Sequence, residues 1–306
     1  MNIKNKITEL VEMRPSTQLL GIILVIIHAF SMSILYAVGK NLTKAVSPEQ
    51  VSFLYKTSVF LITFPWCLKN GISGLLYTTK IHLHIARAIF SLTGTVCFYH
   101  GIASIKIIDA AAVTYLENIL VLIVGILIFK EKTTSAKIVA GIFGVLGTIL
   151  VMKPGFEFNH GYFYLFGALI FWLLNNITIK VLGRTERSKT QLFYSSMFGS
   201  LFSLPLIWGR SWEGFMFEHM EYVVIMAIFH ALHTVCIFRA LKLGDISTVM
   251  PFDYTRLIFT GVIGYIVFNE VPGVTSFIGY CLIIFGGIYL IVEEGKKYGW
   301  AKKKNS

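Results

Sequence analysis

Charged residues are scarce in this chain. Asp, Glu, Lys and Arg make up 14% of its 306 residues, whereas hydrophobic residues make up 55%, and the mean hydropathy is +0.71. In soluble globular domains about a quarter of the residues are charged, and such domains cannot bury this much apolar surface. The composition therefore excludes an ordinary soluble domain and predicts a chain embedded in a membrane.

Cysteine pairs and nucleotide-binding motifs are missing as well. The chain has four cysteines, none in a CxxC arrangement, so we expect neither a disulfide framework nor a zinc site. No GxxxxGK[ST] sequence is present, so a process driven by ATP would require a partner. No loop is long enough to fold as a separate soluble domain. We expect no metal, no cofactor and no catalytic residue.

Long apolar runs fill most of the chain. Each is long enough to cross a bilayer as a helix, which takes about 20 residues, whereas strands of a β-barrel would be half as long and alternate in polarity. The first run contains His28 and lacks a small-residue cleavage site, so we expect a retained span rather than a signal peptide. The ten expected spans cover residues 18–38, 50–68, 83–104, 107–129, 136–152, 161–181, 190–208, 221–241, 246–268 and 274–292.

Basic residues predict how these spans are oriented. If the N-terminus is cytoplasmic, most loop and tail Lys and Arg fall on the cytoplasmic face, as the positive-inside rule requires. The other face then has only Lys40, Lys44, Lys106, Lys153 and Arg210. The net charge of +11 is spread along one membrane face, so we expect lipids and not nucleic acid as its partner. The sequence predicts a multi-pass protein of the cell inner membrane with both termini cytoplasmic.

The second half of the chain repeats the first. At an offset of 139 along the sequence, several residues recur in order, including Tyr55 with Tyr194, Cys97 with Cys236, Tyr115 with Tyr254 and Glu131 with Glu270. At an offset of 140, Lys40 aligns with Lys180 and Leu42 with Leu182. Five spans per half place the second copy upside down, so residues 18–152 and 161–292 are expected to form two inverted five-helix repeats. Residues 1–17 and 293–306 are expected to be cytoplasmic tails.

Glycines recur on one face of the fifth span, at Gly141, Gly144 and Gly147, and they punctuate the tenth at Gly279 and Gly286. Small residues let membrane helices approach closely. We expect these faces to pack within one chain, with a homodimer interface as the alternative.

Ionisable residues inside the spans are the main candidates for a functional site. Lys56 lies in the second span, Glu117 in the fourth, and Asp253 and Arg256 in the ninth. A charge in a bilayer is costly unless it is paired or wetted, so such residues are functional candidates by default. Glu117 and Arg256 are equivalent at the offset of 139, so a two-fold axis would bring them to facing positions, whereas Lys56 has only Ser195 as its equivalent.

Two interpretations of these charges stay open. They could form structural ion pairs, Glu117 with Lys56 and Asp253 with Arg256, that hold the bundle together. Alternatively, they line a polar cavity, in which Lys56 and Arg256 hold a carboxylate and Glu117 takes an amine or a proton. We favour the cavity, because two acids and two bases gather in three helices.

Further polar residues could join this cavity. His230 and His233 are spaced i, i+3, which is not the HExxH metal motif, so substrate or helix contacts are favoured over zinc. His28 could titrate near neutral pH and, like Glu117, carry a coupling proton. Other candidates at the site are Tyr115, Asn118, Asn175, Asn176 and Tyr254. Arg87 could either extend to the membrane surface or reach the cavity.

Two matching Phe-X-Glu sequences each end in an acid: Glu131 after the fourth span and Glu270 after the ninth. An acid at the C-terminal end of a helix opposes the helix dipole. Its recurrence predicts a local partner, such as backbone amides of the loop.

Several of these segments resemble the drug/metabolite transporter superfamily of the EamA type. The likeness is carried by Tyr115-Leu-Glu-Asn through Phe129-Lys-Glu131, by Met152-Lys-Pro-Gly155, and by Pro251-Phe-Asp-Tyr-Thr-Arg256 through Phe268-Asn-Glu270. The resemblance implies two inverted five-helix repeats around a central cavity, alternating access, and transport of metabolites such as amino acids or nucleotides. Its Phe-Asn-Glu ending is similar to that of S-adenosylmethionine uptake proteins. The family often has Pro where Asn118 stands, so we expect a less kinked fourth helix.

The sequence thus favours a secondary active transporter of a small polar or zwitterionic metabolite. The alternative is an intramembrane enzyme acting on a lipid or a prenyl carrier. Such an enzyme would require paired catalytic carboxylates or a metal motif at the membrane face, and the sequence has neither. A channel is disfavoured because no filter sequence or ring of equivalent charges is present.

Overall fold

The computed structural model describes residues 15–68, 77–128, 130, 133–152, 159–212, 218–243 and 250–297, and within these ranges it contains helices and no strands. The first half comprises α2 (Pro15–Leu42), α3 (Pro48–Leu68), α4 (Ile81–Ser104), α5 (Ile107–Thr114), α6 (Leu116–Leu127) and α7 (Ser135–Met152). The second comprises α8 (Gly161–Leu182), α9 (Ser188–Ser203), η1 (Pro205–Ile207), α11 (Met220–Leu243), η2 (Met250–Tyr254), α13 (Thr255–Phe268) and α14 (Val274–Lys297).

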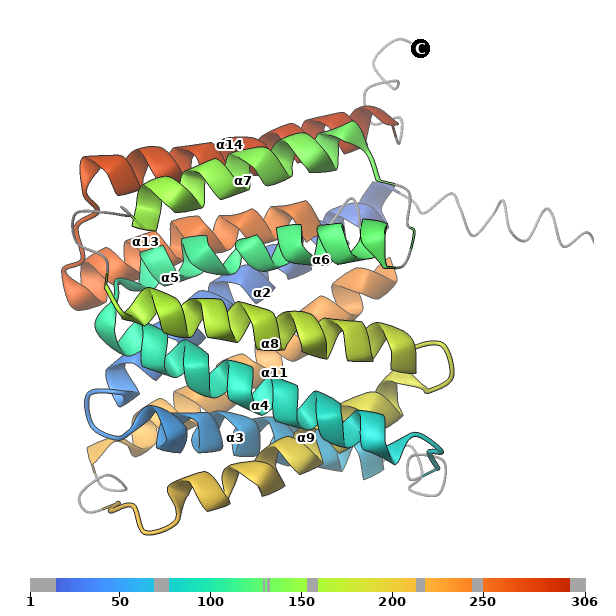
Figure 1. The fold of residues 1–306 in the computed structure, drawn as a ribbon, viewed down its shortest axis with the longest axis vertical. Helices are drawn as coiled ribbons and strands as arrows, with labels where there is room; N and C mark the ends of the chain where they lie inside the picture. Colours follow the sequence, from blue (N-terminus) through green and yellow to red (C-terminus); the bar gives the residue numbers. More distant parts are fainter. Residues whose placement is uncertain are drawn as a thin grey trace, which may run out of the picture.

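These helices run side by side, and successive membrane segments along the chain alternate in direction (Figure 1). Counted with α5–α6, α9–η1 and η2–α13 as one segment each, they form the ten expected membrane segments. We name the two ends of the bundle after residues that lie there. The Lys40 end is where α2 ends and α8 begins, and the Lys180 end is where α8 ends, on the right in Figure 1. The chain enters α2 and leaves α14 at the Lys180 end.

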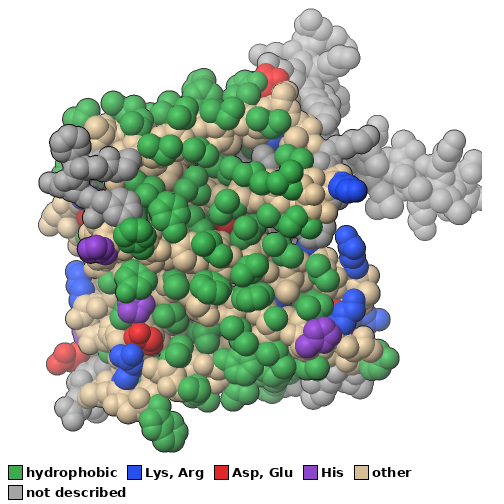
Figure 2. Space-filling model, viewed as in Figure 1, with side chains coloured by type: hydrophobic (Ala, Val, Ile, Leu, Met, Phe, Trp, Pro, Cys, Tyr) green, Lys and Arg blue, Asp and Glu red, His purple; other side chains and the backbone are tan. Residues whose placement is uncertain are grey.

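The outer surface of the bundle is suited to lipid. Six helices are long and apolar enough to cross a membrane by length and composition. Large apolar side chains point outward along them, among them Ile170 (56% exposed), Phe277 (58%) and Ile288 (54%). Figure 2 shows hydrophobic side chains over the middle of the visible face and Lys and Arg side chains near its two ends. This is the distribution expected of a membrane protein.

The helices pair as two inverted repeats require. In the first repeat α4 packs along α8 of the second, and α11 packs along α2 in the equivalent way. Helices α7 and α14, which are equivalent to each other, pack together on small residues. A Cβ atom added to Gly147 would lie 2.5 Å from the carbonyl oxygen of Gly279, and one added to Gly286 would lie 3.1 Å from that of Ala140. These two contacts are related by the offset of 139, and the expected glycine packing within one chain is confirmed.

The fourth and ninth segments are interrupted at equivalent positions. Tyr115 separates α5 from α6, and Tyr254 ends η2 where α13 begins. These interruptions divide the expected spans over residues 107–129 and 246–268, and the expectation of a less kinked fourth helix stays a prediction. The interruption needs no proline, because the Tyr115 amide bonds to the Ala112 carbonyl in a tighter turn and the Tyr115 hydroxyl bonds to the Asp253 carbonyl.

The Phe-X-Glu sequences end these segments in matching ways. Lys130 and Asn269, which are equivalent in the two repeats, are the non-glycine residues with positive φ in the described part of the chain, at 53° and 52°. In the second repeat, the amide of Glu270 bonds back to the Gly264 carbonyl, which closes the last turn of α13. Glu131 lies outside the described residues.

Candidate functional site

A cavity of about 580 Å³ lies at the centre of the bundle, between the two repeats. Its wall comes from α2, α3, α4, α6, α8, α11 and α13, with Thr114 at the end of α5. From mid-bundle it extends toward the Lys180 end, where Arg87, Ile179 and Ile237 belong to its wall. The cavity thus reaches toward the end of the bundle at which the chain enters α2 and leaves α14.

Five of the residues that the sequence suggested for substrate or proton binding line this cavity: His28, Lys56, Glu117, His233 and Arg256. Asn175, Asn176 and Arg87 also line it, so Arg87 reaches the cavity rather than the membrane surface. Tyr115, His230 and Asp253 contact lining residues from behind, and Tyr254 stacks on Tyr115. The side chain of Asn118 lies outside the described residues. Whether these residues bind substrate stays a prediction.

Glu117 and Arg256 occupy equivalent places in the cavity wall and make equivalent contacts. Glu117 Oε1 accepts a hydrogen bond from Asn176 Nδ2 at 2.7 Å. Arg256 donates from Nη1 to the hydroxyl of Tyr36 at 3.3 Å. Tyr36 and Asn176 are equivalent at the offset of 140, which also relates α2 to α8. The two-fold scaffold is therefore kept here, while the chemistry of the two contacts differs.

One of the two expected ion pairs is present. Arg256 Nη2 lies 3.0 Å from Asp253 Oδ2, and both side chains are largely buried, at 12% and 13% exposure. Lys56 does not pair with Glu117; its Nζ donates to Ser91 Oγ at 2.9 Å. Glu117 is thus the acid of the cavity wall that has no cationic partner among the described residues. The interpretation that all four charges are structural pairs is wrong for Lys56 and Glu117.

Three histidines form a chain beside the Arg256–Asp253 pair. His28 Nε2 lies 3.7 Å from Asp253 Oδ1, and His28 Nδ1 lies 3.3 Å from His233 Nδ1. The ring of His230 packs edge-on against His233 and against Tyr55. Within the described ranges, no group of three or more His, Cys, Asp or Glu is arranged to hold a metal ion.

Aromatic residues form a large part of the remaining wall, and the sequence analysis singled out none of them as a site candidate. Tyr36, Phe98 and Trp172 pack in succession, with ring centroids 4.7 Å and 5.4 Å apart. Tyr55 and Tyr99 complete this surface. A tyrosine or tryptophan in an apolar span is equally compatible with a lipid interface. The repeat matches Tyr55 with Tyr194 and Tyr36 with Asn176, but neither match assigns a place in a cavity wall.

The Lys40 end of the bundle is closed by contacts between the repeats. Lys40 Nζ lies 2.5 Å from Glu270 Oε1, and Glu270 Oε2 accepts a hydrogen bond from the Ile107 amide at 2.8 Å. We expected a local partner for Glu270, such as an amide of the adjoining loop; its partner is a backbone amide, but one in the first turn of α5 in the other repeat. Ile105 and Ile107, whose backbone groups bond to Lys40 and Glu270, are buried.

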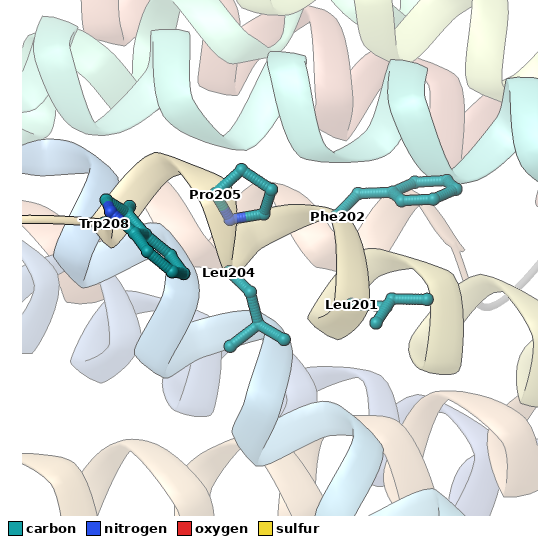
Figure 3. A pocket seen from close by; sticks show the side chains of 5 residues that line it. All are labelled: Leu201, Phe202, Leu204, Pro205 and Trp208. Atoms are coloured by element: carbon teal, nitrogen blue, oxygen red, sulfur yellow. The ribbon is translucent and has the colours of Figure 1, made fainter.

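Two other pockets differ from the central one. A shallow pocket at the end of α9 and at η1 is lined only by Leu201, Phe202, Leu204, Pro205 and Trp208 (Figure 3), and three of these side chains are strongly exposed. Its surroundings suit lipid acyl chains. A cavity of about 220 Å³ near the Lys40 end contains Asp109, an intramembrane acid that the sequence analysis did not single out. The Tyr280 hydroxyl donates to its carboxylate.

The chain is similar to proteins of known family. The sequence model of the EamA-like transporter family matches residues 19–153 and 159–292. An S-adenosylmethionine uptake transporter of Rickettsia prowazekii is 22% identical over 281 residues, covering 92% of this chain and 95% of the relative. The pseudopaline exporter CntI of Pseudomonas aeruginosa is 20% identical over 272 residues, with 88% and 95% covered. A riboflavin transporter of Vibrio cholerae is 24% identical over 254 residues, with 81% and 84% covered.

A solved structure has the same fold. A crystal structure of a protein 18% identical in sequence superimposes with a TM-score of 0.64, over 93% of this chain and 99% of the other. At this identity the likeness shows the fold alone.

Proposed function

Because this chain belongs to the EamA-like transporter family, we propose that it is a secondary active transporter that moves a small zwitterionic metabolite through the central cavity by alternating access. Its similar proteins are named as transporters of different compounds, in uptake and in export. The family therefore supports membrane transport, and the substrate has to be argued from the cavity.

The observation that carries the proposal is the charge arrangement of the cavity wall. Glu117 offers a carboxylate without a cationic partner among the described residues, and Lys56 offers an ammonium group whose described polar partner is Ser91. Groups buried in this way favour a ligand that carries both signs of charge. Interrupted helices at equivalent positions of two inverted repeats are also typical of a transporter's substrate site.

Within this class, we propose S-adenosylmethionine as the substrate. Its sulfonium and ammonium groups are cations, which aromatic faces and an acid stabilise. The cavity supplies Tyr36, Phe98 and Trp172 together with Glu117. Relatives named as S-adenosylmethionine uptake transporters align with most of this chain. At 22% identity, an amino-acid or nucleotide-like compound remains the competing substrate.

The direction of opening follows from the orientation that we propose. The positive-inside rule assigns the Lys180 end, where both termini emerge, to the cytoplasm of a bacterial inner membrane. The cavity then faces inward, and the Lys40–Glu270 pair closes the outer side. An outward-facing state would form by rocking one repeat against the other, and His28 or Glu117 would carry a coupling proton.

Reconstitution into liposomes tests the proposal. Proteoliposomes loaded with unlabelled S-adenosylmethionine should show saturable counterflow of the labelled compound. Glu117→Gln should reduce this counterflow strongly, whereas Lys80→Gln, a change outside the cavity wall, should not. Conversion of a lipid or prenyl carrier into product without any flux would overturn the transporter in favour of an intramembrane enzyme.

A further inference from the structure

Two cations in one part of the cavity wall form no ion pair with a carboxylate among the described residues. Lys56 is 8% exposed, and its described hydrogen bond is to Ser91. Arg87 donates from Nη1 to the Gln191 carbonyl at 2.9 Å, and its buried Nε has no hydrogen-bond partner. Neither residue belongs to the ion pairs found in the described part of the chain.

The two cations lie close together. Ser91, which accepts from Lys56, follows Arg87 by four residues in α4. Residues at this spacing are neighbours on the same helix face. Lys56, Arg87 and Ser91 all line the central cavity. Their side chains therefore present two positive charges and a hydroxyl to one patch of its wall, on the side nearer the Lys180 end.

Burying two like charges in a wall of low dielectric is unfavourable unless an anion joins them. Arg256 differs in this respect, because Asp253 already neutralises it at 3.0 Å. The carboxylate site that the sequence suggested between Lys56 and Arg256 therefore has only one cation free to bind a carboxylate, namely Lys56. The patch formed by Lys56 and Arg87 has two.

We propose that Lys56, Arg87 and Ser91 form the subsite for the α-carboxylate of the substrate. This inference rests on the proposed function, since it assigns one end of the zwitterion. The planar fork of Arg87 and the ammonium group of Lys56 bind the two carboxylate oxygens. The cationic end of the substrate then lies beside Glu117, with the aromatic wall between the two ends. Lys56 and Arg87 thereby select amino-acid-type substrates over amines that lack a carboxylate.

A pair of ligands that differ only in this group tests the subsite. Binding of S-adenosylmethionine and of decarboxylated S-adenosylmethionine to the purified protein is measured by calorimetry. Wild type should prefer the carboxylate-bearing ligand by about 10- to 100-fold, as expected for charge-assisted hydrogen bonds. Lys56→Gln and Arg87→Gln should each reduce this preference about tenfold and keep the affinity for the decarboxylated ligand, which also reports correct folding. Lys56→Arg should retain the preference, and Lys80→Gln should leave it unchanged.

Three results would count against the subsite. If both variants lose affinity for the two ligands equally, or keep the full preference for the carboxylate-bearing ligand, the subsite is wrong while the transporter proposal stands. If wild type binds neither ligand, the proposed substrate fails, and the subsite fails with it.

Discussion

Tyr115 and Tyr254 stack on each other at the centre of the molecule, with ring centroids 4.8 Å apart and planes 10° from parallel. They are equivalent at the offset of 139 and occupy the same position in the two repeats. Each marks the interruption of its membrane segment. The pseudo-two-fold axis thus passes close to a contact between equivalent residues, and the hydroxyl of Tyr115 bonds to the Asp253 carbonyl at 2.7 Å.

A double-mutant cycle should show that this stack couples the two repeats. We expect Tyr115→Leu and Tyr254→Leu each to lower the free energy of unfolding, and the pair to couple by about 0.5–1.5 kcal/mol, the usual value for aromatic pairs. Denaturant unfolding in detergent gives the four values. Tyr115→Phe keeps the ring and loses only the hydrogen bond, so it should cost about 1 kcal/mol and preserve the coupling. Additive effects of the two leucine variants would contradict the prediction.

Two acids near the cavity should respond differently to loss of charge. Glu117→Gln keeps a hydrogen-bonding group for Asn176, so the fold should be retained while affinity for a cationic substrate falls about 10-fold or more. Asp253→Asn leaves Arg256 unpaired, which should destabilise the fold by about 3–5 kcal/mol. Thermal unfolding with and without S-adenosylmethionine separates the two effects. The assignment of roles would be wrong if Asp253→Asn melted like wild type or Glu117→Gln kept the full ligand shift.

The architecture was readable from the sequence because hydrophobic length and repetition are local, one-dimensional signals. The ten segments and their inverted arrangement follow from apolar runs and a constant offset. The interruption at Tyr115 was not predictable in this way. It depends on a hydrogen bond to Asp253, far away in the sequence, and no glycine or proline at Tyr115 marks it.

The cavity was predictable only in part for the same reason. Charged residues such as Glu117 stand out in an apolar span, so they were found. Their partners could not be assigned, because the sequence alone allows Lys56 to pair with Glu117. Packing of the helices instead places Ser91 beside Lys56 and Asn176 beside Glu117. Trp172, an aromatic residue in an apolar span, carries no signal at all.

His28 should be required for proton coupling and not for exchange. It lines the cavity and lies between Asp253 and His233, so a proton held there would alter the charge beside the substrate. In liposomes, we expect His28→Gln to remove the stimulation of uptake by an inward proton gradient while counterflow without a gradient continues. His82→Gln, an exposed change at the start of α4, is the control. A gradient response that survives in His28→Gln would exclude this role.

Close packing of α7 on α14 should tolerate a methyl group at one glycine and not at another. In Gly147→Ala, the new Cβ would lie 2.5 Å from the Gly279 carbonyl oxygen, and backbone must move. In Gly141→Ala, the closest atoms belong to Ile119, at 3.8 Å and beyond. We expect Gly147→Ala to lower the free energy of unfolding by about 1–3 kcal/mol, and Gly141→Ala to be neutral or slightly stabilising. Equal unfolding midpoints for the two variants would contradict the packing.

The Lys40–Glu270 pair should hold the molecule closed at the Lys40 end. It joins α2 to the end of α13, and Lys40 also donates to the Ile105 carbonyl. Removing it with Lys40→Met takes away a charge-assisted contact of about 1.5–3 kcal/mol from the closed state alone, which shifts the population toward opening. Spin labels at the exposed positions Ala45 and Val271 should then report a longer distance component in double electron–electron resonance.

Lys44→Met is the matched control, because Lys44 lies over the ring of Phe268 and forms no ion pair with Glu270. Glu270→Gln should reproduce the shift, and an unchanged distance distribution in both Lys40→Met and Glu270→Gln would show that the closure depends on the surrounding apolar packing instead.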